Sequence, residues 1–136
     1  MRRILIDTGA IYAFVVRNDL HHREAIAFTV ESLAAGGRFV LADLVFAETM
    51  TLLKARLGSQ VALRVGRELR RNSAYEWVPM GQEGEEETWA TFQRFGDKPW
   101  SYTDCALWVL GKRLRVNEIF AFDQHFSQMP AIVRLP

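Results

Sequence analysis

Short apolar segments alternate with longer segments of helical periodicity, and this alternation restricts the fold of the chain more than any other feature. The apolar segments expected as strands are residues 3–7, 39–42, 75–78, 119–122 and 131–135. The segments expected as helices are residues 10–15, 21–35, 44–57, 59–72, one segment ending at Gly96, and 101–114. Strands separated by helices pair in parallel and are covered on both faces. The sequence therefore predicts an α/β fold with three layers, α/β/α, around a mostly parallel sheet of about five strands.

Glycines and small polar residues mark the expected ends of the helices. Gly36 follows the helix 21–35 and Gly58 follows the helix 44–57, as expected for residues that end helices. Asp43 and Ser59 are expected as N-caps of the helices that follow them. Ser101 begins the last helix in a pattern typical of a capping box.

Length, charge and cysteine content restrict the class of protein. A chain of 136 residues predicts a single domain that spans residues 1–136. The net charge of +1 produces no overall field that would require a nucleic-acid partner. The only cysteine, Cys105, excludes an internal disulfide and favours a reducing, cytoplasmic location. Because no apolar run approaches 18 residues, no membrane span is expected.

Four acidic residues lie where the apolar pattern predicts burial or the end of a strand. Asp7 and Asp123 end strands, Glu48 lies beside the apolar stripe of its helix, and Asp104 lies in the first turn of the last helix. The carboxyl ends of neighbouring parallel strands form the ligand crevice of an α/β sheet. Carboxylates that converge there repel one another unless a cation binds them, and hard oxygen ligands favour Mg²⁺ or Mn²⁺.

Each of the four acids also has an ordinary structural interpretation. Asp104 can be a carboxylate that only stabilises the start of a helix. Glu48 can be a solvated residue at the rim of an apolar stripe, and Asp7 and Asp123 can begin turns or cap helices. The case for a metal site therefore depends on all four residues together.

In order and spacing, these residues resemble the PIN-domain ribonucleases, in particular the VapC-like toxins of toxin–antitoxin pairs. The resemblance covers nearly the whole chain, including a segment 19–25 that is similar to an Asp-x-x-His-x-x-Ala stretch of the family. The matching motifs each carry one acid: Leu5-Ile6-Asp7-Thr8, Leu44-Val45-Phe46-Ala47-Glu48, Ser101-Tyr102-Thr103-Asp104 and Phe122-Asp123-Gln124-His125-Phe126.

The resemblance implies an Mg²⁺- or Mn²⁺-dependent endoribonuclease, often a homodimer, that acts as the toxin of a type II pair with a cognate antitoxin. Asp7, Glu48, Asp104 and Asp123 would then be the catalytic, metal-binding residues. Thr8 and Ser101 are expected to orient Asp7 or a water with their hydroxyl groups. Many members of the family carry an acid where this chain has His125. This difference leaves open whether the site holds one metal ion or two, and whether His125 instead contacts a phosphate.

Three other classes of protein share parts of this pattern. Leu5-Ile6-Asp7-Thr8-Gly9-Ala10 is similar to the active-site signature of retroviral-type aspartic proteases, but those are all-β and this chain is rich in helical segments. Phosphoacceptor receiver domains carry a lysine after a late strand, and no lysine follows Lys112 here. A catalytically inactive PIN-like scaffold, which binds RNA or protein without turnover, stays open as the alternative.

Basic and aromatic residues give weaker indications of RNA binding. Arginines in the segment 59–72, and basic residues in the segments 112–115 and 2–3, could hold phosphates, although a solvated surface is the simpler interpretation. The tryptophans are expected in the core or in a dimer interface. The exception is the segment 100–102, whose aromatics are close enough to Asp104 to stack on unpaired bases.

Overall fold

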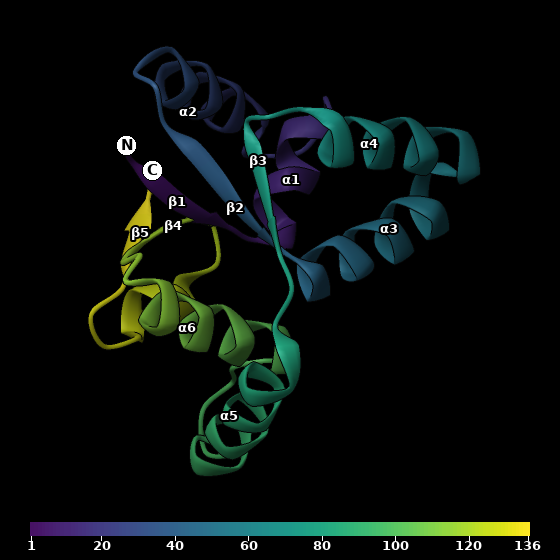
Figure 1. Ribbon diagram of the computed structural model, residues 1–136. Coiled ribbons are helices and arrows are strands. Elements are labelled where there is room, and N and C mark those ends of the chain that lie inside the picture. The colour runs from purple at the N-terminus through teal and green to yellow at the C-terminus, as the bar shows by residue number, and fades with distance from the viewer.

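The computed structural model describes all residues, 1–136, and contains a five-stranded sheet with helices on both faces (Figure 1). The strands are β1 (Arg3–Ile6), β2 (Arg38–Ala42), β3 (Tyr75–Val78), β4 (Glu118–Phe120) and β5 (Val133–Leu135). The helices are α1 (Thr8–Val15), α2 (His22–Ala34), α3 (Asp43–Leu57), α4 (Ser59–Arg71), α5 (Gly81–Arg94), α6 (Tyr102–Leu114) and the short 3-10 helix η1 (Gln124–Gln128). The predicted α/β class and the five-stranded sheet are confirmed.

All neighbouring strands are parallel, in the order β3-β2-β1-β4-β5. The chain builds outward from β1 to β2 and β3 on one side, and then returns to place β4 and β5 on the other side. The strand order therefore reverses between β1 and β4, which are directly hydrogen-bonded, with Ile6 opposite Phe120. At such a switch point the connections diverge from the carboxyl ends of two adjacent strands and leave a crevice.

Alternating side chains of the strands pack against different helix layers. Ile6 and Phe120 face a cavity of about 250 Å³ that is also lined by α1, α2 and α4. Leu5, one position earlier on β1, lies on the other face, against Gly111 of α6. Figure 1 shows the same division, with α2 above the sheet, α6 below it, and the α3–α4 hairpin extending to one side. None of the helices combines the length and apolar character needed to cross a bilayer.

The structure corrects several expected element boundaries. Asp43 and Ser59 are the first residues of α3 and α4, and Ala42 and Gly58 occupy the N-cap positions. The Asp43 carboxylate accepts a hydrogen bond from Leu44 N–H at 2.9 Å and from Met80 N–H at 3.2 Å, so this side chain also ties α3 to the segment before α5. β4 ends two residues earlier than expected, because the chain turns there into η1, which the sequence pattern did not reveal.

The tryptophans divide into two groups. Trp100 and Trp108 are buried, as expected for core residues, and both pack against the partly buried Phe95. Trp77 and Trp89 are 42% and 55% exposed, so of the two expected locations, the core does not apply to them and the dimer interface stays a prediction. They remain available for an interface.

Gly111 lies where α6 packs tightly against Leu5 of β1 and the carbonyl group of Val116, and its replacement by alanine is expected to destabilise the protein. An added Cβ would lie 2.8 Å from the carbonyl oxygen of Val116 and 3.2 Å from Leu5 Cδ1. Overpacking of this kind costs about 1–3 kcal/mol, and backbone cannot move aside as a flexible side chain can. Urea unfolding of Gly111→Ala should show this loss. Gly84→Ala on α5 is the control, since its Cβ would meet only Met80, at 3.4 Å, and should leave the stability unchanged or raise it. Equal stability of the two variants would contradict the packing argument.

Candidate metal centre

Asp7 lies at the carboxyl end of β1, at the switch point of the sheet. Its backbone N–H donates to the carbonyl of Phe120 at 3.1 Å, which continues the β1–β4 ladder by one residue. Its own carbonyl accepts from the N–H groups of Ala10 and Ile11, so Asp7 is also the N-cap residue of α1. The side chain makes no capping bond and is only 8% exposed. The strand and the helix thus fix a buried carboxylate beside the end of β4.

A capping box holds Asp104 at the start of α6. Ser101 Oγ accepts from the N–H of Asp104 at 3.0 Å, and Asp104 Oδ2 accepts from the N–H of Ser101 at 2.9 Å. These reciprocal bonds satisfy two N–H groups that a helix start leaves free. Asp104 is nevertheless 7% exposed, which is unusual for a carboxylate whose only role is to cap a helix. The capping box was expected, and Ser101 uses its hydroxyl to position Asp104 rather than Asp7.

Glu48 reaches the same region from α3. It lies on the exposed side of that helix, while its neighbours Val45 and Thr49 are fully buried. Its Oε2 accepts a hydrogen bond from Thr103 Oγ1 at 3.1 Å. This contact joins α3 to the first turn of α6, one residue before Asp104, although 55 residues separate the two partners in sequence.

Asp123 and His125 complete the group from the other side of the switch point. Asp123 is the N-cap of η1, and its Oδ1 accepts from the N–H of His125 at 2.9 Å. The imidazole Nδ1 of His125 lies 3.1 Å from Asp123 Oδ1 and 3.4 Å from Asp104 Oδ2. One potential ligand atom from each of Asp104, Asp123 and His125 lies within 4.8 Å of the others. His125 was not among the predicted ligands, and the only sequence signal for it was its position two residues after Asp123.

The electrostatics of the site show that its acids are close and lack positive partners. Burial, followed by the negative charges of Asp104, Glu48 and Asp123, raises the pKa of Asp7 to about 7. Burial also raises the pKa of Asp104 above its ordinary value, against the hydrogen bond from Ser101 N–H, which lowers it. No lysine or arginine forms an ion pair with any of these four acids. Two buried, interacting carboxylates without a cationic partner are costly, and a bound cation would relieve that cost.

The donor set fits a divalent cation. Carboxylate oxygens come from four separate elements of the fold, and an imidazole nitrogen lies between two of them. The hydroxyl oxygen of Thr8, directly after Asp7, is buried and has no hydrogen-bond partner within the protein. A buried polar atom without a partner is uncommon in native proteins and is often satisfied by a bound ion or water. Asp104, Asp123 and His125 offer ligand atoms within 4.8 Å of one another, whereas Asp7 and Glu48 lie outside this close group. The charges of Glu48, Asp104 and Asp123 raise the pKa of Asp7, so these four acids, with Thr8, form the set that could hold a cation.

Four of the nine basic residues considered as phosphate contacts, in the segments 2–3 and 112–115, already have partners. Arg2 and Arg3 form ion pairs with Glu118 and Glu76, at 2.8 and 2.7 Å. Arg113 pairs with Glu87, and Lys112 lies over the ring of Trp108 at 4.6 Å. The N-terminal segment and the end of α6 therefore serve the stability of the domain more directly than RNA binding.

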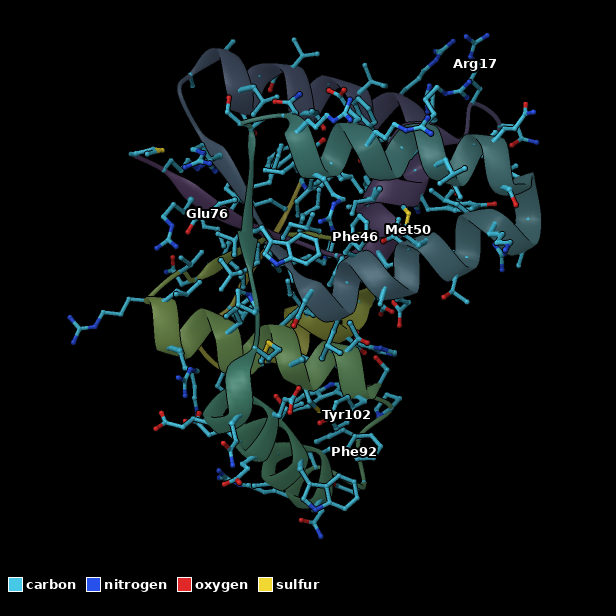
Figure 2. All side chains as sticks on the ribbon, turned by 45° about the vertical axis from the view of Figure 1, so that its right-hand side comes forward. Arg17, Phe46, Met50, Glu76, Phe92 and Tyr102 are labelled. Carbon is cyan, nitrogen blue, oxygen red and sulfur yellow. The ribbon has the colours of Figure 1, made fainter.

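The segment 100–102 offers a single accessible aromatic ring. Trp100 is buried, so it has no face free for a base. Tyr102 is half-buried and packs edge-on against Phe92 of α5, with ring centroids 5.6 Å apart. Figure 2 shows these two side chains together at the lower end of the molecule. Of the aromatics near Asp104, Tyr102 is the one placed to stack on an unpaired base.

Comparison with known proteins identifies the class. Residues 4–132 match the family model of the PIN domain. Because this match spans nearly the whole chain, the protein belongs to the PIN-domain family. The search of curated proteins gives no match.

Solved structures share the fold. The crystal structure of Mycobacterium tuberculosis VapC20, described as a toxin that cleaves the sarcin–ricin loop, is 23% identical. It has a TM-score of 0.81 over 92% of this chain and 93% of that chain. DNA-bound VapBC from Salmonella typhimurium is 17% identical, with a TM-score of 0.69 over 99% and 98% of the two chains. A toxin–antitoxin complex from Klebsiella pneumoniae is 20% identical, with a TM-score of 0.65 over 96% and 95%. These likenesses establish the same fold.

Proposed function

We propose that this protein is a divalent-metal-dependent endoribonuclease whose reaction takes place at Asp7, Glu48, Asp104 and Asp123. The observation that carries the proposal is the pair of buried carboxylates, Asp7 and Asp104. Burial raises the pKa of both, the charge of Asp104 also raises the pKa of Asp7, and neither carboxylate is paired with a lysine or arginine. Membership of the PIN family supports the same activity. Mg²⁺ and Mn²⁺ are the cations that suit a set of carboxylate oxygens.

Each acid has a role that follows from its place in the fold. Asp7 and Asp104 are held by backbone and by the capping box, so they are the rigid, buried ligands. Thr103 holds one oxygen of Glu48, which leaves the other oxygen for the cation or for the attacking water. When bound, a divalent cation lowers the pKa of water and stabilises negative charge on the phosphate. The more exposed side chains of Glu48 and Asp123 lie where an RNA strand can approach.

The activity is tested with short single-stranded and hairpin RNAs, in Mn²⁺, in Mg²⁺ and in chelator. Asp104→Asn retains an acceptor oxygen for Ser101 N–H, so the variant should fold while its cleavage rate falls by about 100-fold or more. Glu85→Gln, on the exposed face of α5, is the matched control and should cleave as the wild type does. Cleavage that survives both chelation and Asp104→Asn would remove the assignment. RNA binding without any metal-dependent turnover would instead support the inactive scaffold.

We also propose that the protein is the toxin of a type II toxin–antitoxin pair, and that RNA is its cellular target. The support comes from the neighbours, since VapC20 is described as a toxin that cleaves the sarcin–ricin loop and the Klebsiella structure as a toxin–antitoxin complex. A ribosomal RNA hairpin is therefore the first structured substrate to test. Expression of the wild type should arrest growth, and expression of Asp7→Asn should not. Equal growth of the two strains would refute the toxin role without affecting the nuclease assignment.

A homodimer is part of the same proposal. The exposed Trp77 and Trp89 offer apolar surface of the kind that interfaces cover. Light scattering after gel filtration would give the mass directly, and a monomer at micromolar concentration would count against a stable dimer.

A further inference from the structure

The imidazole of His125 points its Nδ1 atom into the acidic group rather than toward solvent. Nδ1 is 3.1 Å from Asp123 Oδ1 and 3.4 Å from Asp104 Oδ2. The atom is buried, and neither contact has the geometry of a hydrogen bond. The nitrogen thus lies close to two carboxylates but has no hydrogen-bond partner inside the protein.

The backbone fixes this position. Asp123 Oδ1 accepts from the N–H of His125 and so closes the first turn of η1. Phe126, the next residue, is 1% exposed and anchors η1 in the core. His125 therefore lies on a short helix that is fixed at both sides of this residue, and this helix holds the imidazole ring near the acids.

The distances match those between adjacent ligands of one cation. Ligands at 2.0–2.1 Å in an octahedral site lie about 3 Å apart along each edge of the octahedron. The separations of 3.1 and 3.4 Å between Nδ1 and the two carboxylate oxygens are close to this value. Only small movements would bring all three atoms onto the same ion.

We propose that His125 Nδ1 is a ligand of the cation, together with Asp104 and Asp123, and that this nitrogen makes the site favour Mn²⁺ over Mg²⁺. The inference rests on the proposed metal-dependent function and adds to it a ligand and a selectivity. Mg²⁺ strongly prefers oxygen ligands, while imidazole is a good ligand for transition-metal cations. A site of oxygen atoms alone would lack this bias.

The alternative is that His125 only positions Asp123 by donating Nδ1–H to its carboxylate. That arrangement would place no nitrogen on the metal. In that case, replacing His125 would weaken the binding of Mn²⁺ and Mg²⁺ equally, because the site would lose the same well-oriented carboxylate oxygen for both cations. The two interpretations therefore differ in a spectroscopic and in a thermodynamic observable.

The first experiment is pulsed electron paramagnetic resonance of the full chain loaded with Mn²⁺, with no RNA and no activity measurement. The wild type should show ¹⁴N coupling to Mn²⁺, replaced by ¹⁵N coupling after labelling of histidine. His125→Gln should lose that coupling. His22→Gln is the control and should keep it, since His22 Nδ1 contacts the carbonyl of Ala13, away from the acids.

The second experiment measures the affinities of wild type and His125→Gln for Mn²⁺ and Mg²⁺ by calorimetry. The preference for Mn²⁺ should fall by about tenfold or more in the variant, through weaker binding of Mn²⁺. Bound Mn²⁺ without ¹⁴N coupling, or equal losses for both cations, would overturn the role of His125 and leave the proposed function standing. Absence of Mn²⁺ and Mg²⁺ binding by the wild type would overturn the proposed function as well.

Discussion

Asp7→Asn is expected to abolish cleavage of RNA and, at the same time, to make the metal-free protein more stable at neutral pH. The two effects have one cause. Asp7 is held in a buried position beside Asp104, which raises its pKa from 3.8 to about 7. The negative charge of Asp7 therefore destabilises the fold when no cation is bound.

The pH dependence of this effect follows from the raised pKa. Between pH 3.8 and about 7 the folded protein binds a proton at Asp7 that the unfolded chain has released, so stability falls as the pH rises through this window. The full difference is at most about 4 kcal/mol. Asparagine carries no charge, so the variant should show no such loss. The stability advantage of Asp7→Asn should be near zero at pH 4 and greatest above pH 7.

Thermal unfolding in chelator at several pH values measures this advantage, and a parallel cleavage assay measures the loss of activity, expected at about 100-fold or more. Added Mn²⁺ should reverse the order, because it stabilises only a protein that binds it. Asp97→Asn is the matched control, since Asp97 is exposed and should change neither property. Equal stability of wild type and Asp7→Asn at pH 8 in chelator would contradict the buried-charge argument.

Phe120→Ala is expected to lower the free energy of unfolding by about 3–5 kcal/mol, the largest loss of stability among these variants. Phe120 is fully buried in β4, and its ring packs against Phe28 of α2 and Phe39 of β2, with centroids 4.7 and 5.6 Å apart. Removing the ring would leave a cavity between α2, β2 and β4. The hydrogen-bonded strands around it cannot move together to fill this cavity.

Urea unfolding of Phe120→Ala provides the measurement. Phe120→Leu should lose less, because it fills more of the same space, and Trp89→Ala should change stability by no more than about 0.5 kcal/mol, since Trp89 is 55% exposed. Because the carbonyl of residue 120 accepts from the N–H of Asp7, a folded Phe120→Ala should also bind Mn²⁺ more weakly. A loss below about 1 kcal/mol would show that the β1–β4 core tolerates the cavity.

The layered fold could be predicted from the sequence because its central strands, β1, β2 and β4, are buried on both faces. β1 and β2 are continuous apolar runs, and the glycines at 36 and 58 adopt φ values of 85° and 91° that favour glycine at helix ends. Cap positions were harder to predict. Asp43 has the residue type of an N-cap, but its carboxylate is shared with Met80 N–H, a contact that depends on tertiary structure.

The candidate site was predictable to a similar extent. Asp7 could be found because it interrupts an apolar run at the end of a strand, and Asp104 because it completes a capping-box pattern at the start of a helix. The hydrogen bond between Glu48 and Thr103 joins segments that are distant in sequence, so the local periodicity of the sequence could not predict it. The position of His125 depends on η1, a short 3-10 helix without a periodic signal, so the sequence could not place its imidazole beside Asp104.

The pairing of β1 with β4 has a consequence for the synthesis of this protein. Asp7 is synthesised before its backbone partner Phe120, and Asp123 and His125 follow still later. A nascent chain in which β4 and η1 have not yet emerged from the ribosome can pair β1 with β2, but it lacks the β1–β4 pair and two side chains of the candidate site. Any activity that depends on these residues can therefore arise only after β4 and η1 have joined the elements that fold before them.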